Sequence, residues 1–237
     1  MRKHLTAAVA LAGLCLAGPT WAANGNIGLF FDQGAALCQA DAACQGGMPS
    51  VLTLYVYALL QGSSGSGITG AEYSVREGAN NTLEMNENSW LFSESFDPAA
   101  TTIGSGAFTP ADPSPRGINM AYPSCQHGDG TKVLLETVQI LNIGCTSSTL
   151  KLTVVKHSTA SNQFFQCPLF TLCDAPVFTK VCLGSNLTVC RNPEPPNPNN
   201  ATCSTSGQAF LNPAPGFNCT VAVQNQTWSQ VKQMYNN

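Results

Sequence analysis

Seven stretches of the chain are rich in Val, Ile, Leu, Thr and Tyr, the composition of β-strands. Within residues 52–58 the apolar side chains fall at every second position, with Thr or Tyr between them. Residues 150–154 repeat this alternation with Lys and Thr. A period of two predicts strands with one apolar, buried face and one solvent-exposed face. The seven predicted strands cover residues 26–33, 50–61, 68–77, 116–122, 132–143, 149–157 and 176–183.

Strong turn signals separate these strands, notably the Gly/Ser run at 62–67 and Asp-Pro-Ser-Pro at 112–115. Residues 133–143 would also fit a helix, but the flanking glycines and the β-branched neighbouring segments favour a strand. The segment 83–92 fits either a strand edge or one helical turn. At least seven short strands without a long helical pattern predict an all-β fold, an antiparallel β-sandwich or jelly roll.

The sequence changes character after about residue 185. Prolines and asparagines crowd residues 192–200, and six cysteines fall between 167 and 219. This stretch has too little apolar material for a core of its own. It predicts a disulfide-held, mostly irregular extension over 185–226.

Residues 227–237 predict a short amphipathic helix. Thr227 and Gln230 have the spacing of a capping box. The apolar stripe of this helix consists of Trp228, Val231, Met234 and Tyr235. So short a helix is not stable alone in water. Two interpretations follow: the stripe packs on its own domain, or it docks on a partner.

Residues 1–22 predict a secretory signal peptide. Arg2 and Lys3 supply the positive start, an apolar stretch follows from Leu5 to Leu16, and cleavage is expected near Ala22. The stretch is shorter than the ~20 residues of a membrane span, and no transmembrane segment is predicted elsewhere. The predicted organisation is therefore a signal peptide (1–22), a β-sandwich domain (23–184), the extension (185–226) and the terminal helix (227–237), in a secreted protein that is extracellular or periplasmic.

Five segments carry a resemblance to a known pattern. They are GLFFD (28–32), LTLYVYALL (52–60), GITGAEYSV (67–75), GINMAYPSC (117–125) and TWSQVKQMY (227–235). Together they resemble a family of secreted bacterial β-sandwich proteins with a cohesin-like jelly-roll strand pattern. The resemblance covers about residues 26–182 and the tail, and it implies a bacterial cell-surface location. It brings no functional residues with it, and the stretch from Cys182 to Cys219 departs from the pattern.

Composition narrows the classes of function. Only 10% of residues are charged, and ten Lys and Arg face thirteen Asp and Glu. The predicted signal peptide holds two of the ten basic residues. The chain has no Lys/Arg cluster of the kind that phosphate binding needs, which argues against a nucleic-acid partner. Polar character comes mainly from uncharged side chains, as in many extracellular β-proteins.

The chain contains eleven cysteines, and removal of Cys15 with the signal peptide leaves an even number. Paired cysteines persist in the oxidising compartment that an exported chain enters. Their spacings do not fit the close pairs of a zinc site. We therefore expect disulfides among Cys38, Cys44, Cys125, Cys145, Cys167, Cys173, Cys182, Cys190, Cys203 and Cys219. Spacing favours Cys38–Cys44 and Cys125–Cys145, because each pair closes a short loop beside a predicted strand.

The sequence holds no Gly-x-Ser-x-Gly nucleophile motif, and His127 and His157 are interpreted as surface residues. Trp90 would either stack on a sugar ring or lie in the core. Several carboxylates are concentrated in one region and would suit a calcium ion or a glycoside-hydrolase pair. They are Glu84, Glu87, Glu94, Asp97 and Asp112.

These observations favour a secreted, non-enzymatic β-sandwich protein that serves in binding or adhesion or as an extracellular structural component. The expected partners are a glycan or a protein at the cell surface, or a second copy of the chain. No catalytic residue and no cofactor is assigned, with calcium as the metal alternative. The alternative function is a secreted carbohydrate-active hydrolase with an unrecognised carboxylate site.

Overall fold

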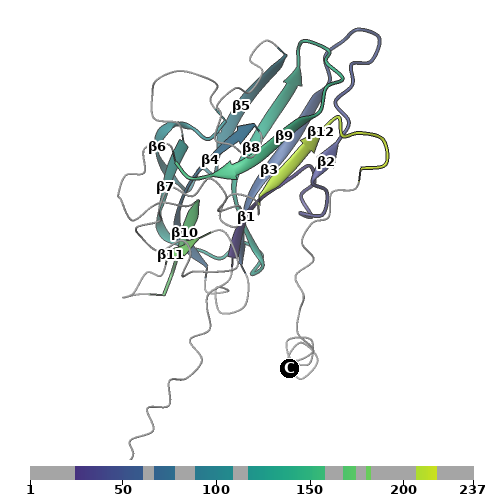
Figure 1. Cartoon of the computed structure of the whole chain (residues 1–237). Coiled ribbons are helices and arrows are strands. Elements are labelled where there is room, and N and C mark those ends of the chain that lie inside the picture. Colours follow the sequence, from purple (N-terminus) through teal and green to yellow (C-terminus); the bar gives the residue numbers. More distant parts are fainter. Residues whose placement is uncertain are drawn as a thin grey trace, which may run out of the picture.

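The computed structural model describes residues 25–60, 67–77, 89–108, 117–157, 168–174, 180–182 and 207–217. In these residues the chain is all-β and forms two sheets (Figure 1). No helix in this part of the chain is long and apolar enough to cross a membrane.

The first sheet has four strands in the order β1-β3-β8-β5, and all three pairings are antiparallel. We call it the four-stranded sheet. Its strands are β1 (Gly25–Phe30), β3 (Val51–Leu60), β8 (Lys132–Asn142) and β5 (Trp90–Phe96).

The second sheet has eight strands, six of them in the order β11-β10-β4-β9-β12-β2. The other two are joined through β7, which pairs with both β4 and β6. Strands β12 and β2 pair in parallel, whereas the other pairings among the described strands of this sheet are antiparallel. The strands are β2 (Gln39–Ala40), β4 (Ile68–Glu77), β6 (Thr101–Gly106), β7 (Gly117–Gln126), β9 (Leu150–Val155), β10 (Leu169–Leu172), β11 (Lys180–Cys182) and β12 (Gln208–Leu211).

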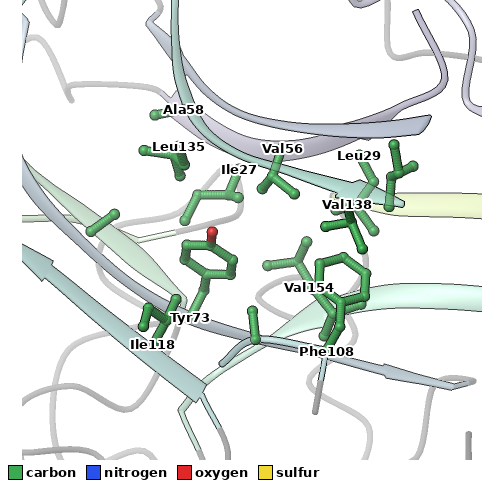
Figure 2. Close-up of a cluster of buried hydrophobic side chains, with 14 of the residues drawn as sticks. Ile27, Leu29, Val56, Ala58, Tyr73, Phe108, Ile118, Leu135, Val138 and Val154 are labelled. Carbon is green, nitrogen blue, oxygen red and sulfur yellow. The ribbon is translucent and has the colours of Figure 1, made fainter. Parts of the chain in front are cut away.

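The hydrophobic core lies between the two sheets (Figure 2). The four-stranded sheet contributes Ile27, Val56 and Leu135, and the facing side contributes Tyr73 and Val154. The alternation predicted for residues 52–58 is confirmed at positions 54, 56 and 58, whose side chains are fully buried. Burial of apolar surface from both layers is the main force that holds the sheets together.

Strand β8 changes phase in its middle. Val56 pairs with Glu136 and Tyr57 pairs with Leu134, so Leu135 is an extra residue in the ladder. Such a β-bulge re-aims the side chains that follow it. Before the bulge Val133 and Leu135 are buried, and after it the even positions from Glu136 onward are buried. The bulge therefore places a carboxyl group inside the core.

Each of the seven predicted strands contains an observed strand. The undecided segment 83–92 ends in strand β5. The strands β2, β6, β10 and β12 carry too short a pattern to be predicted. Strand β12 lies within the stretch interpreted as mostly irregular, yet it pairs with β9 and β2. The predicted signal peptide and terminal helix lie outside the described residues, and the domain boundaries stay a prediction.

The predicted solvent-exposed face of β9 is wrong at Thr153, and the polar face of β4 is covered as well. Glu72, Ser74 and Arg76 alternate with the core residues of β4, and all three are buried. Thr153 on β9, which pairs with Arg76, is buried as well. Period-two alternation separates the two faces of a strand, but it does not say whether the polar face is covered.

Gly207 precedes β12 at a point of close approach between the sheets. A Cβ atom there would lie 2.2 Å from the Ile27 carbonyl oxygen and 2.6 Å from Val154 Cγ2. Because the neighbour is backbone, we expect Gly207→Ala to lower the free energy of unfolding by about 3 kcal/mol, measured by urea titration. Gly46→Ala is the control: it has open space and a positive φ, so about 1 kcal/mol is expected. Equal losses would contradict the close approach.

Candidate functional site

A recess opens at the edge of the eight-stranded sheet where strands β2 and β12 end. It has a volume of about 390 Å³ and is open to solvent. We call it the β2–β12 cleft. Ligand sites in proteins commonly have volumes of ~300–1,000 Å³. The cleft is lined by Gln39, Ala40, Asp41, Ala43, Ser147, Asn212 and Pro213.

Asn212 holds the walls of the cleft together. Its Oδ1 accepts the N–H of Ala42 (2.7 Å), and its Nδ2 donates to the carbonyl of Thr146 (2.9 Å). Its own backbone N–H donates to the Ala40 carbonyl (3.0 Å). The residue has a φ of 47°, a conformation that Asn tolerates better than most side chains. Its side chain thus joins two distant loops to the end of β12 and fixes the shape of the cleft.

Polar groups on the wall remain accessible to a ligand. Asp41 Oδ1 accepts the N–H of Ala43 (2.9 Å), and its other oxygen bonds to no described residue. The hydroxyl of Ser147, an exposed residue, bonds to no described residue either. Asp41 is the one charged side chain among the described residues that line the cleft. The described residues of the wall therefore offer acceptors and a hydroxyl, and none of them is basic.

An aromatic pair lies beside the cleft. The rings of Phe210 and Phe217 are 4.6 Å apart and tilted by 51°, and Phe217 is exposed. Gln39, which lines the cleft, donates its Nε2 to the Phe217 carbonyl (3.4 Å). Lys151 Nζ lies 5.8 Å from the centre of the Phe210 ring. The apolar pair and the polar wall are therefore neighbours.

A disulfide between Cys44 and Cys145 ties the loop before β3 to the loop after β8. It joins the chain segments on either side of the cleft, next to Ala43 and close to Ser147. A second disulfide joins Cys125 and Cys173. The predicted pairs Cys38–Cys44 and Cys125–Cys145 are therefore wrong.

The prediction from sequence spacing failed because the bonded cysteines are far apart in the sequence. The two disulfides join cysteines that are separated by 101 and by 48 residues. Cys38 is also disulfide-bonded. The remaining cysteine side chains of the prediction lie outside the described residues.

A second cluster of chemistry-bearing groups lies inside the core. Glu136 is fully buried, and Tyr73 donates its hydroxyl to Glu136 Oε1 (2.9 Å); Figure 2 shows this hydroxyl pointing across the core. Glu136 Oε2 is buried without a hydrogen-bond partner. Glu94 Oε1 on β5 accepts the N–H groups of Ala107 (2.6 Å) and Phe108 (3.1 Å).

Burial, and then the negative charge of Glu94, raises the pKa of Glu136 well above its usual range. The hydrogen bond from Tyr73 acts in the opposite direction. Burial and the nearby Glu136 carboxyl also raise the pKa of Tyr73. The raised pKa favours the neutral form of Glu136 at the bulge, because an ionised Oε2 would be a buried charge without a partner.

The carboxylates predicted as calcium ligands are not brought together among the described residues. Glu94 binds two backbone N–H groups, and Asp97 Oδ1 accepts the N–H of Ala99 (2.9 Å) in a turn. No group of three His, Cys, Asp or Glu side chains in the described ranges is placed to hold a metal ion. Calcium binding stays a prediction. The other carboxylates, Glu84, Glu87 and Asp112, lie outside the described residues.

Trp90 is 3% exposed and belongs to the core cluster, so its ring offers no open face to a sugar. His127 is exposed as predicted, but the surface assignment of His157 is wrong. His157 is buried because its ring lies over Gly117, where a Cβ would be 2.3 Å from ring Cδ2. The predicted docking stripe lies outside the described residues; it comprises Trp228, Val231, Met234 and Tyr235.

Sequence reasoning did not find the cleft residues. They lie in a two-residue strand, a loop and a strand end that are distant in the sequence. Asp41 lies between two cysteines and Asn212 precedes a proline, and these are turn signals without chemical meaning on their own.

No protein-family model matches the chain, and no curated protein sequence matches it. The cohesin-like resemblance therefore stays a prediction. Among solved structures, the chain is similar to a crystal structure of a mutant of CfaE, the CFA/I adhesin of enterotoxigenic E. coli, with 9% sequence identity and a TM-score of 0.28. The similarity covers 78% of this chain and 48% of the adhesin chain. The chain thus matches about half of the adhesin's length.

Proposed function

We propose that the chain is an extracellular, non-enzymatic β-sandwich protein that binds a neutral saccharide in the β2–β12 cleft. The observation that carries the proposal is the cleft itself, a polar recess with an exposed aromatic ring beside it. Sugar hydroxyls both donate and accept hydrogen bonds, and the C–H faces of a pyranose pack on aromatic rings. Asp41 and Ser147 supply the first kind of contact, and Phe217 supplies the second.

The rigidity of the cleft supports a binding role. Asn212 bonds to the loops that contain Ala42 and Thr146 and to strand β2, and the Cys44–Cys145 disulfide joins the segments on either side. Walls that are fixed before binding lose little conformational entropy when a ligand enters. A neutral ligand is favoured because the cleft has one carboxylate and no basic side chain among its described lining residues.

The placement of the acids favours binding over hydrolysis. A glycoside hydrolase uses two carboxyl groups that flank the scissile bond. Asp41 is the single carboxylate among the described residues of the cleft, and Glu136 is sealed in the core. A fully buried acid has no access to a sugar. Disulfides support an oxidising, extracellular compartment, and the predicted signal peptide agrees with it.

Blocking the cleft tests the proposal. Ala43 is exposed and lines the cleft, so Ala43→Trp is expected to fill the space and weaken saccharide binding at least tenfold without loss of stability. The measurement is a glycan array of neutral oligosaccharides, followed by calorimetric titration of each hit. Ala99→Trp is the matched control, because Ala99 is exposed in the turn after β5.

Equal saccharide affinity of wild type and Ala43→Trp would show that the saccharide does not bind in this cleft. Binding confined to sulfated or sialylated glycans would overturn the neutral ligand class, and the absence of any hit would overturn the saccharide assignment. Ser147→Ala, which removes one hydroxyl, is expected to weaken binding less than Ala43→Trp does.

A further inference from the structure

Exposed apolar side chains gather at one end of the four-stranded sheet, on the face away from the core. Val51 pairs with Leu141, and Leu141 pairs with Leu91 on the other side. The three side chains thus form a row across β3, β8 and β5, which lie side by side (Figure 1). Val51 is 58% and Leu91 51% exposed. Ile143 follows Leu141 by two positions and is 40% exposed.

Met48, 72% exposed, extends the row. It follows Gly47, whose carbonyl oxygen lies 3.8 Å from Cys145 Sγ, close to Ile143 in the sequence. We call these five residues the apolar rim; they are Met48, Val51, Leu91, Leu141 and Ile143. The next row of the same face consists of Thr53, Gln139 and Ser93. Contiguous apolar surface of this kind marks an interaction site.

The rim and its neighbouring row carry no charged side chain, so electrostatic attraction does not select what covers them. An occupant must bring its own apolar surface. The sequence provides such a surface at residues 227–237, where four apolar side chains fall on one stripe of a predicted helix. That helix is too short to be stable in water without a packing surface.

The described chain ends at a point that hydrogen bonds connect to the rim. The last described residue, Phe217, bonds through its carbonyl to Gln39 of β2. Three residues after Gln39, the Ala42 carbonyl accepts the Ser50 hydroxyl (2.6 Å), and Ser50 directly precedes Val51. The ten residues from 218 to 227 can span about 35 Å when extended. This length is sufficient to carry the predicted helix from Phe217 to the rim.

We propose that residues 227–237 form a helix that docks its apolar stripe on the apolar rim of the same chain. In the docked state Trp228, the largest side chain of the stripe, would pack on Val51 and Leu91. A tethered segment meets the rim at an effective concentration in the millimolar range. A second copy of the chain would have to overcome the entropy of association, so the chain's own tail is the favoured occupant.

A double-mutant cycle in the full chain tests the docking. Trp228→Ala is expected to lower the Tm by about 5–10 °C, because it removes a large side chain from a packed contact. Val51→Ser with Leu91→Ser is expected to lower the Tm by a similar amount. All three substitutions together are expected to cost no more than either set alone, because both remove the same contact.

Ile103→Ser is the matched control for the rim variants. Ile103 is an exposed apolar residue of β6 in the other sheet, and its replacement is expected to leave the Tm unchanged. The fluorescence of Trp228 in the folded protein reports docking separately from stability, because a general loss of stability would not change it below the unfolding transition. The difference between the spectra of wild type and Trp228→Phe isolates the emission of Trp228, which docking shifts to the blue and shields from iodide. Val51→Ser with Leu91→Ser is expected to restore iodide quenching below the unfolding transition.

An unchanged Tm in Trp228→Ala, or a quenchable Trp228 in the wild type, would overturn the docking. So would strictly additive losses in the cycle. A dimer that dissociates in the rim variants and persists in Trp228→Ala would assign the rim to a second copy of the chain instead.

Discussion

Replacing Glu136 with Gln is expected to raise the free energy of unfolding at neutral pH and to flatten its dependence on pH. The amide is neutral at every pH and has nearly the shape of the neutral acid. Its oxygen can accept the Tyr73 hydroxyl as Glu136 Oε1 does, and its N–H groups can point toward the Glu94 carboxylate. The variant therefore keeps the contacts of the native state without requiring a proton.

The sign follows from the raised pKa of Glu136 in the folded protein. Above the ordinary value of 4.5, the unfolded chain releases this proton while the native state keeps it. The free energy of unfolding then falls with rising pH, with a slope of up to about 1.4 kcal/mol per pH unit. The stabilising effect is complete below the unfolded pKa and is lost as the pH rises through the folded pKa.

Urea titrations of wild type and Glu136→Gln from pH 4 to pH 9 would measure the slope. Asp129→Asn is a control of opposite sign, because hydrogen bonds from Thr131 and Lys132 lower the pKa of Asp129. This variant is expected to lower the free energy of unfolding at neutral pH, where the Asp129 carboxylate is bonded, and to change the pH dependence only at acid pH. A Glu136→Gln variant with the wild-type slope would show that Glu136 is ionised in the core.

Removing the Cys44–Cys145 disulfide by replacing both cysteines with Ser is expected to lower the free energy of unfolding by about 4.7 kcal/mol. The bond closes a segment of 101 residues, and a long closed segment restricts the unfolded chain strongly. Urea titration would measure the loss. The same double variant is also expected to weaken saccharide binding, because Cys44 is next to Ala43 in the cleft wall.

The second disulfide provides the control. Cys125 and Cys173 are separated by 48 residues, so replacing both is expected to cost about 0.7 kcal/mol less. That double variant is expected to bind saccharide normally. Equal loss of binding in both would mean that general destabilisation, and not the geometry of the cleft, sets affinity. If a variant does not fold, stepwise reduction of the wild type followed by mass mapping gives the same comparison.

The all-β fold could be predicted because alternation is a local property of the sequence. The bulge in β8 could not, since uninterrupted alternation through Val133 and Leu135 places Glu136 on the outer face. One extra residue reverses this alternation and places the Glu136 carboxyl group in the core. The hydrogen bond from Tyr73 offsets part of the cost of burying this carboxyl group. Tyr73 belongs to a distant strand of the other sheet, so this contact has no local sequence signal.

The candidate cleft could not be predicted from the sequence for a related reason. Its shape depends on Asn212, and the partners of this residue lie in two loops that precede it by many positions. No local spacing encodes such contacts. The disulfides show the same limit, because Cys44 bonds to Cys145 and not to the nearer Cys38. Strands could be predicted from the sequence, whereas contacts between distant loops could be identified only in the three-dimensional structure.

The parallel pairing of β12 with β2 joins segments that lie near opposite ends of the described chain. Ala42 and Asn212, which bond beside these strands, are 170 residues apart. Contacts of such long range form slowly, because the chain must close a large loop before it gains their energy. During synthesis the edge of β9 that β12 covers stays open until residue 211 has emerged. A growing chain therefore exposes an unpaired strand edge from the completion of β9 until β12 has been synthesised, and such an edge can pair wrongly with another chain.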